Sequence, residues 1–253
     1  MNTPSYAGSI ALRIINVISL LAVLVVNALA NALPINGVTT GELSARYPNL
    51  FVPAGITFSI WGVIYLLLAA FVIYQLRREA PVREEVGWLF PISCAANVGW
   101  IFAWHYTLTL LSLLIMVVLF VTLFAIHQRL GNANGRAGGG IKWFGHLPFG
   151  VYFGWISVAL IANATAVLVD LRWNGFGIPE PVWAVVMIAV GAIVGALVVL
   201  KRNDIFFGLV FVWAYAGIVL KRITTEPAHR SVVVAAALCA VILLVLAVIR
   251  APR

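Results

Sequence analysis

The amino-acid sequence predicts an all-α protein, a polytopic bundle of about eight transmembrane helices. Hydrophobic residues make up 63% of the 253 residues and charged residues only 9%, against roughly a quarter in soluble domains. The apolar windows are long enough to cross a hydrocarbon core of about 30 Å, which takes roughly 20 helical residues. The short alternating segments of a transmembrane β-barrel are not found. The chain is therefore expected to lie in a lipid bilayer.

Eight helices are expected, each bounded by charge, proline or glycine. The first is interpreted as a retained helix, because its apolar stretch is longer than the hydrophobic region of a signal peptide. The seventh is short, so the Lys and Arg residues at its ends are expected to snorkel to the interface. The predicted ranges are Ile14–Leu33, Pro53–Leu76, Val86–Tyr106, Leu108–Ile126, Leu147–Leu171, Val182–Leu200, Ile205–Leu220 and Ser231–Ile249.

The distribution of Lys and Arg predicts the orientation of the bundle. Of the 16 such residues, eleven fall on the side of both termini, and the other side holds only Arg46, Arg172, Lys221, Arg222 and Arg230. The positive-inside rule then places both termini in the cytoplasm. We expect the bacterial cytoplasmic membrane as the location. The net charge of +8 is explained by this topology, and no nucleic-acid partner is expected.

The connection 34–52, on the outer side, is unusually long for a helical bundle. It contains Gly37, Glu42, Arg46, Pro48 and Asn49. Loops of this length in compact domains are commonly active-site lids or binding loops. The connection is therefore expected to act as a lid.

Three predicted helices carry stripes of aromatic and polar residues at helical spacing. Residues three or four apart lie on one face of a helix, so each stripe is a continuous surface. By helical rise, Trp61, Asn97 and Asn163 lie at a common depth of roughly 12 Å below the outer boundary. The stripes are Pro53, Thr57, Trp61 and Tyr65 in the second helix, Asn97, Trp100 and Trp104 in the third, and Tyr152, Trp155, Ala159 and Asn163 in the fifth.

These stripes form the candidate ligand-binding site, beneath the predicted lid. Indole and phenol rings stack on a flat conjugated ligand, while an asparagine amide donates to and accepts from its polar edges. Ordinary helix packing is the alternative for any single stripe. Convergence of three stripes at one depth favours the pocket. Tryptophans at span ends are interpreted instead as interface anchors, namely Trp88, Trp143, Trp173 and Trp183.

Two further patterns leave alternatives open. Asn16, Asn27 and Asn31 in the first helix either extend the polar edge of the pocket or hydrogen-bond between helices. Gly191 and Gly195 form a GxxxG motif in the sixth helix, which predicts close helix packing, either within one chain or between two.

Catalytic and metal-binding patterns are not found. All eight acidic residues fall in loops or at helix ends, so no intramembrane carboxylate pair or proton relay is expected. His105, near the outer end of the third helix, is suited to ligate a metal or haem iron, but a lone interfacial histidine is more often solvated. We assign no catalytic residue, no metal and no required cofactor.

The three stripes resemble the TspO, or translocator protein, family of tryptophan-rich sensory proteins. Pro53, Trp61 and Tyr65 keep the spacing of the family's proline and tryptophan motif in the second helix. Its third-helix and fifth-helix motifs are matched by Asn97, Trp100, Tyr152, Trp155, Ala159 and Asn163, with Trp104 in place of another aromatic residue. The resemblance covers roughly residues 10 to 172.

The resemblance implies a five-helix bundle, often dimeric, that binds porphyrins, haem-like tetrapyrroles or other apolar ligands under the first loop. It also implies light-dependent porphyrin breakdown as an activity of some members, through tryptophans that correspond to Trp61, Trp100, Trp104 and Trp155. Whether this chain is an enzyme is left open, and a binding protein is favoured.

We therefore expect two parts, residues 1–172 as a ligand-binding bundle with the lid 34–52, and residues 173–253 as a three-helix membrane extension. The expected function is sensory binding of a planar apolar ligand such as a porphyrin. The alternative is a transporter for a small apolar or zwitterionic solute, although the lack of intramembrane charge argues against proton coupling.

Overall fold

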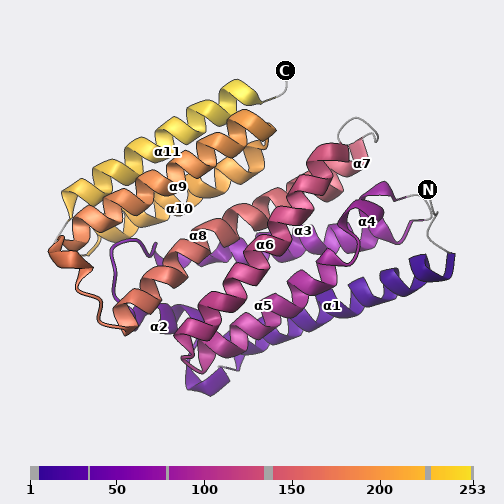
Figure 1. Cartoon of the computed structure of the whole chain (residues 1–253), viewed down its shortest axis with the longest axis horizontal. Coiled ribbons are helices and arrows are strands. Elements are labelled where there is room, and N and C mark those ends of the chain that lie inside the picture. Colours follow the sequence, from indigo (N-terminus) through magenta and orange to yellow (C-terminus); the bar gives the residue numbers. More distant parts are fainter. Residues whose placement is uncertain (1–5, 34, 78–79, 134–138, 226–228, 252–253) are drawn as a thin grey trace.

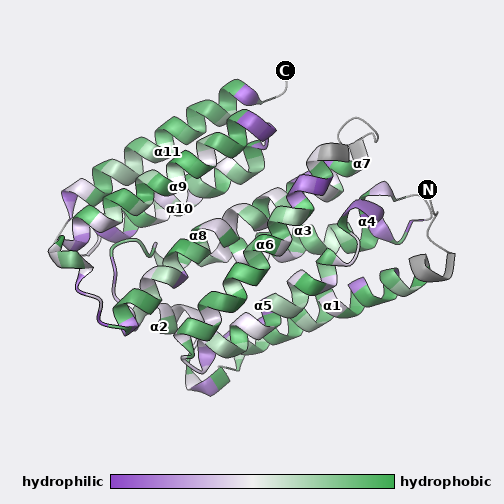
Figure 2. Cartoon of the chain, viewed as in Figure 1, coloured by the Kyte–Doolittle hydropathy of each residue, from purple (hydrophilic) through white to green (hydrophobic). Residues whose placement is uncertain are grey.

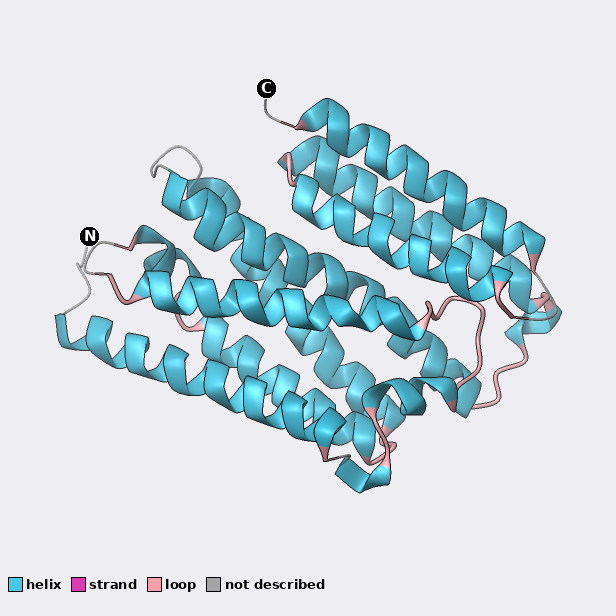
Figure 3. Ribbon diagram, turned by 180° about the vertical axis from the view of Figure 1, so that it is seen from behind, coloured by secondary structure: helices cyan, strands magenta, loops and turns pink. Residues whose placement is uncertain are grey.

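A computed structural model describes residues 6–33, 35–77, 80–133, 139–225 and 229–251. Figure 1 shows long helices running side by side, and the view from behind (Figure 3) shows helices and loops without a strand in the described part of the chain. Seven helices within the described ranges are long and apolar enough to cross a membrane. The predicted all-α transmembrane bundle is therefore confirmed.

Five long helices form the N-terminal bundle. All five were predicted, and most of their ends lie within a few residues of the predicted bounds. The exceptions are α1, which begins earlier than predicted, and α6, which continues about two turns beyond its predicted end. At 17 residues, α5 is shorter than the seven candidate spans. The helices are α1 (Tyr6–Ala32), α3 (Ile60–Gln75) with the preceding 3₁₀ turn η2 (Gly55–Ser59), α5 (Leu89–His105), α6 (Thr109–Ala133) and α8 (Leu147–Asp170), which follows the π-helical turn η3 (Lys142–His146).

Three more long helices lie together along one side of this bundle, coloured orange to yellow in Figure 1. They are α9 (Glu180–Arg202), α10 (Ile205–Ile223) and α11 (Arg230–Arg250). Short elements complete the chain: η1 (Ile35–Gly37), α2 (Thr40–Ala45), α4 (Pro81–Val86), α7 (Gly139–Ile141) and η4 (Gly175–Gly177).

Polar residues gather at the two ends of the bundle, as Figure 2 shows, while the helix walls between them are hydrophobic. We call the end that carries residues 35–52 the loop end. The described helices cross from end to end eight times, so α1 begins and α11 finishes at the end opposite the loop end. The cytoplasmic placement of that end stays a prediction.

Glycines in α8 let α10 approach closely. A Cβ on Gly150 would lie 2.6 Å from Oδ2 of Asp204, and a Cβ on Gly154 would lie 3.0 Å from Cβ of Val210. Gly150 and Gly154 thus form a GxxxG pair that the sequence analysis overlooked. Because lipid gives helices no hydrophobic reason to associate, such close packing is a main source of their affinity.

The GxxxG motif of α9 packs within the chain. A Cβ on Gly191 would lie 3.1 Å from Cε1 of Phe211 in α10, and a Cβ on Gly195 would lie 3.2 Å from Cδ2 of Leu243 in α11. The motif therefore holds α9 against α10 and α11. Of the two alternatives left open by the sequence, packing within one chain or between two, the structure shows the first.

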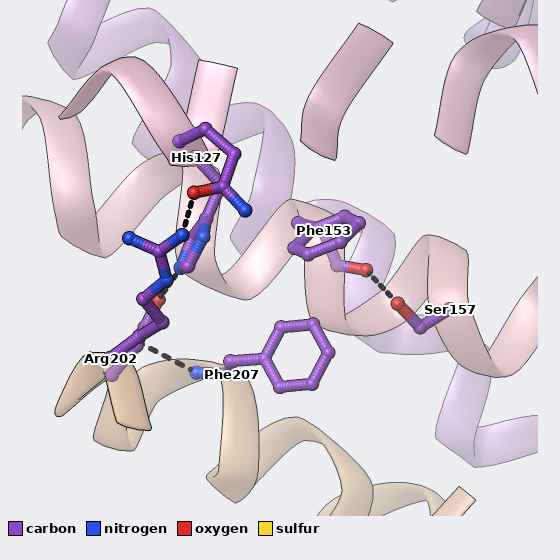
Figure 4. Close-up of polar contacts among 7 residues, drawn as sticks. His127, Phe153, Ser157, Arg202 and Phe207 are labelled. Carbon is purple, nitrogen blue, oxygen red and sulfur yellow. Dashed lines mark hydrogen bonds and ion pairs between the residues drawn. The ribbon is translucent and has the colours of Figure 1, made fainter. Parts of the chain in front are cut away.

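A buried polar pair joins α6 to the start of α10. Nε2 of His127 donates to Oδ2 of Asp204 at 2.9 Å, and both side chains are buried. Oδ1 of Asp204 also caps α10 by accepting from the backbone N–H of Phe207. Figure 4 shows His127, Arg202 and Phe207 gathered at this junction, where Arg202 donates to Gln128. Asp204 lies at a helix end, as expected, but it forms a buried pair that the sequence did not reveal.

The loop-end half of α10 packs on η2. The backbone N–H of Ala54 donates to the carbonyl of Gly217 at 3.0 Å, and Nε1 of Trp213 donates to the carbonyl of Thr57 at 2.9 Å. A Cβ on Gly217 would overlap the Thr57 hydroxyl and lie 3.0 Å from Cβ of Pro53. The absence of a side chain at Gly217 is therefore a condition for this contact.

The first prediction concerns the buried pair. We expect Asp204→Ala to lower the free energy of unfolding by about 3–5 kcal/mol, because it strands His127 and removes the cap. Asp204→Asn keeps a capping oxygen, so its free energy of unfolding is expected to fall by less. Thermal unfolding in detergent micelles measures both. Asp170→Asn, at an exposed helix end, is the control and should cost about 1 kcal/mol; an Asp204→Ala protein as stable as this control would contradict the assignment.

The second prediction concerns Gly217. We expect Gly217→Ala to destabilise the protein by about 1–3 kcal/mol through overpacking against Thr57. Gly62→Ala is the matched control, because nothing lies within 4 Å of a Cβ at that helical position. Combining Gly217→Ala with Thr57→Ala should recover part of the loss in the same unfolding assay. Strictly additive losses in the double variant would show that the two residues do not interact.

Candidate functional site

Aromatic rings from α3, α5 and α8 meet in one cluster near the loop end. Trp61 lies at its centre, with ring centroids 6.4 Å from Trp100, 6.2 Å from Trp155 and 5.7 Å from Tyr65. Trp100 stacks in turn on Trp104, at 5.9 Å and 15°. These separations and tilts are those of favourable aromatic pairs. The convergence of rings that the spacing predicts is therefore observed.

Two small cavities border this cluster. The aromatic cavity, of about 50 Å³, lies between Trp61, Trp100, Trp104 and Trp155 beneath the loop residue Thr40. The side cavity, of about 190 Å³, lies toward α1 and is lined by residues that include Asn27, Asn31, Tyr65, Trp61 and Trp100. Trp61 and Trp100 line both, so these two rings separate one hollow from the other.

Eight of the eleven predicted site residues line a cavity. They are Pro53, Trp61, Trp100, Trp104, Trp155, Ala159 and Asn163 at the aromatic cavity and Tyr65 at the side cavity. The other three line neither cavity. The Thr57 side chain is directed at α10, and the side chains of Asn97 and Tyr152 bond to each other.

A chain of buried hydrogen bonds runs beneath the rings. Nδ2 of Asn27 donates to Oδ1 of Asn97 at 2.8 Å, and Nδ2 of Asn97 donates to the Tyr152 hydroxyl at 3.1 Å. The chain thereby ties α1 to α5 and α5 to α8. Asn97 and Tyr152 thus support the wall of the site rather than face its interior. The sequence left open whether the first-helix asparagines hydrogen-bond between helices or extend the polar edge of the pocket. Asn27 does both, since it bonds to Asn97 of α5 and also lines the side cavity.

Asn163 links the aromatic cavity to α6. Its Nδ2 lies 3.2 Å from the Ser112 hydroxyl, and that hydroxyl lies 3.2 Å from Oδ1 of Asn163. The same hydroxyl lies 2.7 Å from the carbonyl of Thr109. Such pairing fixes the amide in place between two helices.

The described part of the loop, residues 35–52, is fastened to the end of α5 through His105. Nδ1 of His105 donates to the carbonyl of Ile35 at 3.0 Å, and Nε2 lies 3.0 Å from the Thr40 hydroxyl. Nδ2 of Asn36 donates to the carbonyl of His105. His105 is buried, so the expectation of a solvated histidine is wrong, and both ring nitrogens contact the loop.

Within the loop, a capping box shapes α2. The backbone N–H of Thr39 donates to Oε2 of Glu42 at 2.8 Å, and the N–H of Glu42 donates to the Thr39 hydroxyl at 3.3 Å. The hydrogen bonds from the Thr39 N–H and hydroxyl lower the pKa of Glu42. The carboxylate form that completes the box is therefore retained as the pH falls.

Sequence reasoning missed several lining residues. Thr40, Ser44, Asn49, Phe58, Val158, Ala162 and Ala166 all border the aromatic cavity. Phe58 meets Trp155 edge to face at 5.8 Å. Ala162 and Ala166 each lie three residues after a member of the α8 stripe, Ala159 and Asn163 respectively, so helical spacing held a signal for them.

The predicted interface anchors divide into two pairs. Trp88 and Trp143 are 58% and 53% exposed, in keeping with a place at the bilayer interface. Trp173 and Trp183 are only partly exposed, and their ring centroids lie 5.2 Å apart. Nε1 of Trp183 donates to the carbonyl of Gly175, which fixes this second pair beside the loop between α8 and α9.

Comparison with known proteins yields one match. A family model described as TSPO-like protein matches residues 13–249, which includes α9, α10 and α11 as well as the five-helix bundle. No curated protein and no solved structure matches the chain. Since the family match extends over nearly the whole sequence, this integral membrane protein belongs to the TSPO-like protein family.

Proposed function

We propose that the protein binds a planar, largely apolar ligand, such as a porphyrin or a related tetrapyrrole, among the rings of the aromatic cluster. The observation that carries this proposal is a set of unpartnered donors on residues that line the two cavities. Nε1 of Trp100, Nε1 of Trp155 and the hydroxyl of Tyr65 are buried without a hydrogen-bond partner among the described residues. Each such group costs about 1–3 kcal/mol, which a ligand with ring nitrogens or carboxylates would recover.

Binding of a ligand of this size requires the cluster to open. The two cavities, at about 50 and 190 Å³, are smaller than the roughly 300–1,000 Å³ of typical ligand pockets. Trp61 is the ring whose movement would merge them, because it lines both and is partly exposed. We infer that Trp61 swings aside as the ligand enters, and that the ligand then stacks on Trp100 and Trp155.

The loop residues 35–52 would serve as the lid of this site. Thr40 borders both cavities and contacts His105, so a shift of α2 away from α5 would uncover them together. We propose that this loop end faces outward from a bacterial cytoplasmic membrane, with both termini in the cytoplasm, as the Lys and Arg distribution favours.

A titration with protoporphyrin tests the proposal. Purified protein is titrated while tryptophan fluorescence and the main absorption band of the porphyrin are followed. We expect Trp100→Leu and Trp155→Leu each to weaken binding about tenfold, because each removes a stacking face and a buried donor.

Trp88→Leu is the matched control, since Trp88 is exposed at the far end of α5 from the cluster. It is expected to leave the affinity unchanged. Equal affinities in all three variants, with unfolding temperatures near that of the parent protein, would count against the aromatic cluster as the binding site.

A further inference from the structure

A separate and larger cavity lies between α8, α9 and the loop. We call it the α8–α9 cavity; its volume is about 500 Å³, within the range of pockets that hold small molecules. Apolar side chains form most of its wall, among them Phe51, Ile161, Leu168, Ala184 and Met187. Of the residues that line it, Asn49 alone also borders the aromatic cavity, and none lines the side cavity.

The position of the α8–α9 cavity places it at the level of the bilayer interface. It reaches from the apolar wall of α8 to the loop-end residues where the span of α8 ends, at Asp170, and that of α9 begins, at Glu180. Trp173 and Trp183 both line it. Tryptophans at span ends favour the headgroup level, so the cavity extends from that level into the hydrocarbon region.

Two opposite charges lie on the wall of the cavity. Arg172 and Glu180 both line it and both are exposed. Among the described residues the one ion pair is His127 with Asp204, so Arg172 and Glu180 are not within 4 Å of each other or of any other described charged partner. A guanidinium and a carboxylate are therefore presented separately above an apolar hollow.

We propose that the α8–α9 cavity binds a zwitterionic phospholipid. Arg172 would pair with the phosphate, because a guanidinium matches phosphate oxygens bidentately. Glu180 would pair with the ammonium group, and an acyl chain would lie between Ile161 of α8 and Met187 of α9. This site is distinct from the aromatic cluster, and its occupation does not depend on a ligand there.

Native mass spectrometry of the full chain tests this proposal directly. Detergent-purified protein is mixed with equal amounts of phosphatidylethanolamine, phosphatidylglycerol and diacylglycerol. We expect one phosphatidylethanolamine to be retained per chain, about tenfold more than phosphatidylglycerol, because only the former offers an amine to Glu180. Arg172→Gln should release both phospholipids, and Glu180→Gln should reduce phosphatidylethanolamine to the level of phosphatidylglycerol.

Ala184→Phe places a ring in the cavity and is expected to abolish retention. Ala189→Phe on the same helix is the matched control, because Ala189 is exposed on the outer face of α9 and does not line the cavity. Circular dichroism melting shows whether each variant is folded. The proposal is overturned if the parent protein retains no phospholipid, retains phosphatidylglycerol or diacylglycerol in preference, or retains as much lipid as a folded Ala184→Phe variant.

Discussion

The hydrogen-bonded chain of Asn27, Asn97 and Tyr152 sets the geometry on which the site depends. Polar side chains in a bilayer must find partners within the protein, and here they find them across α1, α5 and α8. Trp100 lies three residues after Asn97, and Trp155 lies three residues after Tyr152. Fixing the rotation of α5 and α8 by their polar residues therefore also fixes which way these indoles face.

The C-terminal helices support the same region from the other side. α10 reaches α8 across Gly150 and Gly154, and it reaches η2 across Gly217. η2 precedes α3, the helix that carries Trp61, so the position of α10 bears on the central ring of the cluster. The His127–Asp204 pair secures the opposite end of α10. Helix α10 thus packs against the N-terminal bundle near both of its ends, and α9 supplies one wall of the α8–α9 cavity.

Hydropathy, with charge, proline or glycine at the boundaries, was sufficient to predict the long helices, because each span must be predominantly apolar. The ends were less predictable, since backbone hydrogen bonding continues into polar sequence, as in α6 beyond Ile126. The short helices α2 and α4 lie outside the spans. The sequence carries local signals for both, namely the Thr39–Glu42 capping box for α2 and Pro81 in the first turn of α4, but neither helix was predicted from them.

The aromatic part of the site was predictable from helical spacing, whereas its polar part was not. A stripe shows that Asn97 and Trp100 share a face, but a face is broad enough for one to contact a neighbouring helix while the other borders a cavity. Whether a stripe residue contacts a neighbouring helix or borders the cavity depends on its partners in other helices. The partner of Asn97 in α1 is Asn27, which lies 70 residues away along the chain. The His127–Asp204 pair could not be predicted for the same reason, because its two residues lie 77 positions apart in the chain.

The central claim is that rings from three helices enclose a hollow that opens for a flat ligand. An electron cryo-microscopy map of the protein with protoporphyrin tests it most directly. We predict density for the macrocycle between Trp100 and Trp155, with the Trp61 side chain displaced from its present position. Density on the lipid-facing surface or in the α8–α9 cavity, with Trp61 still stacked on Trp100, would contradict it.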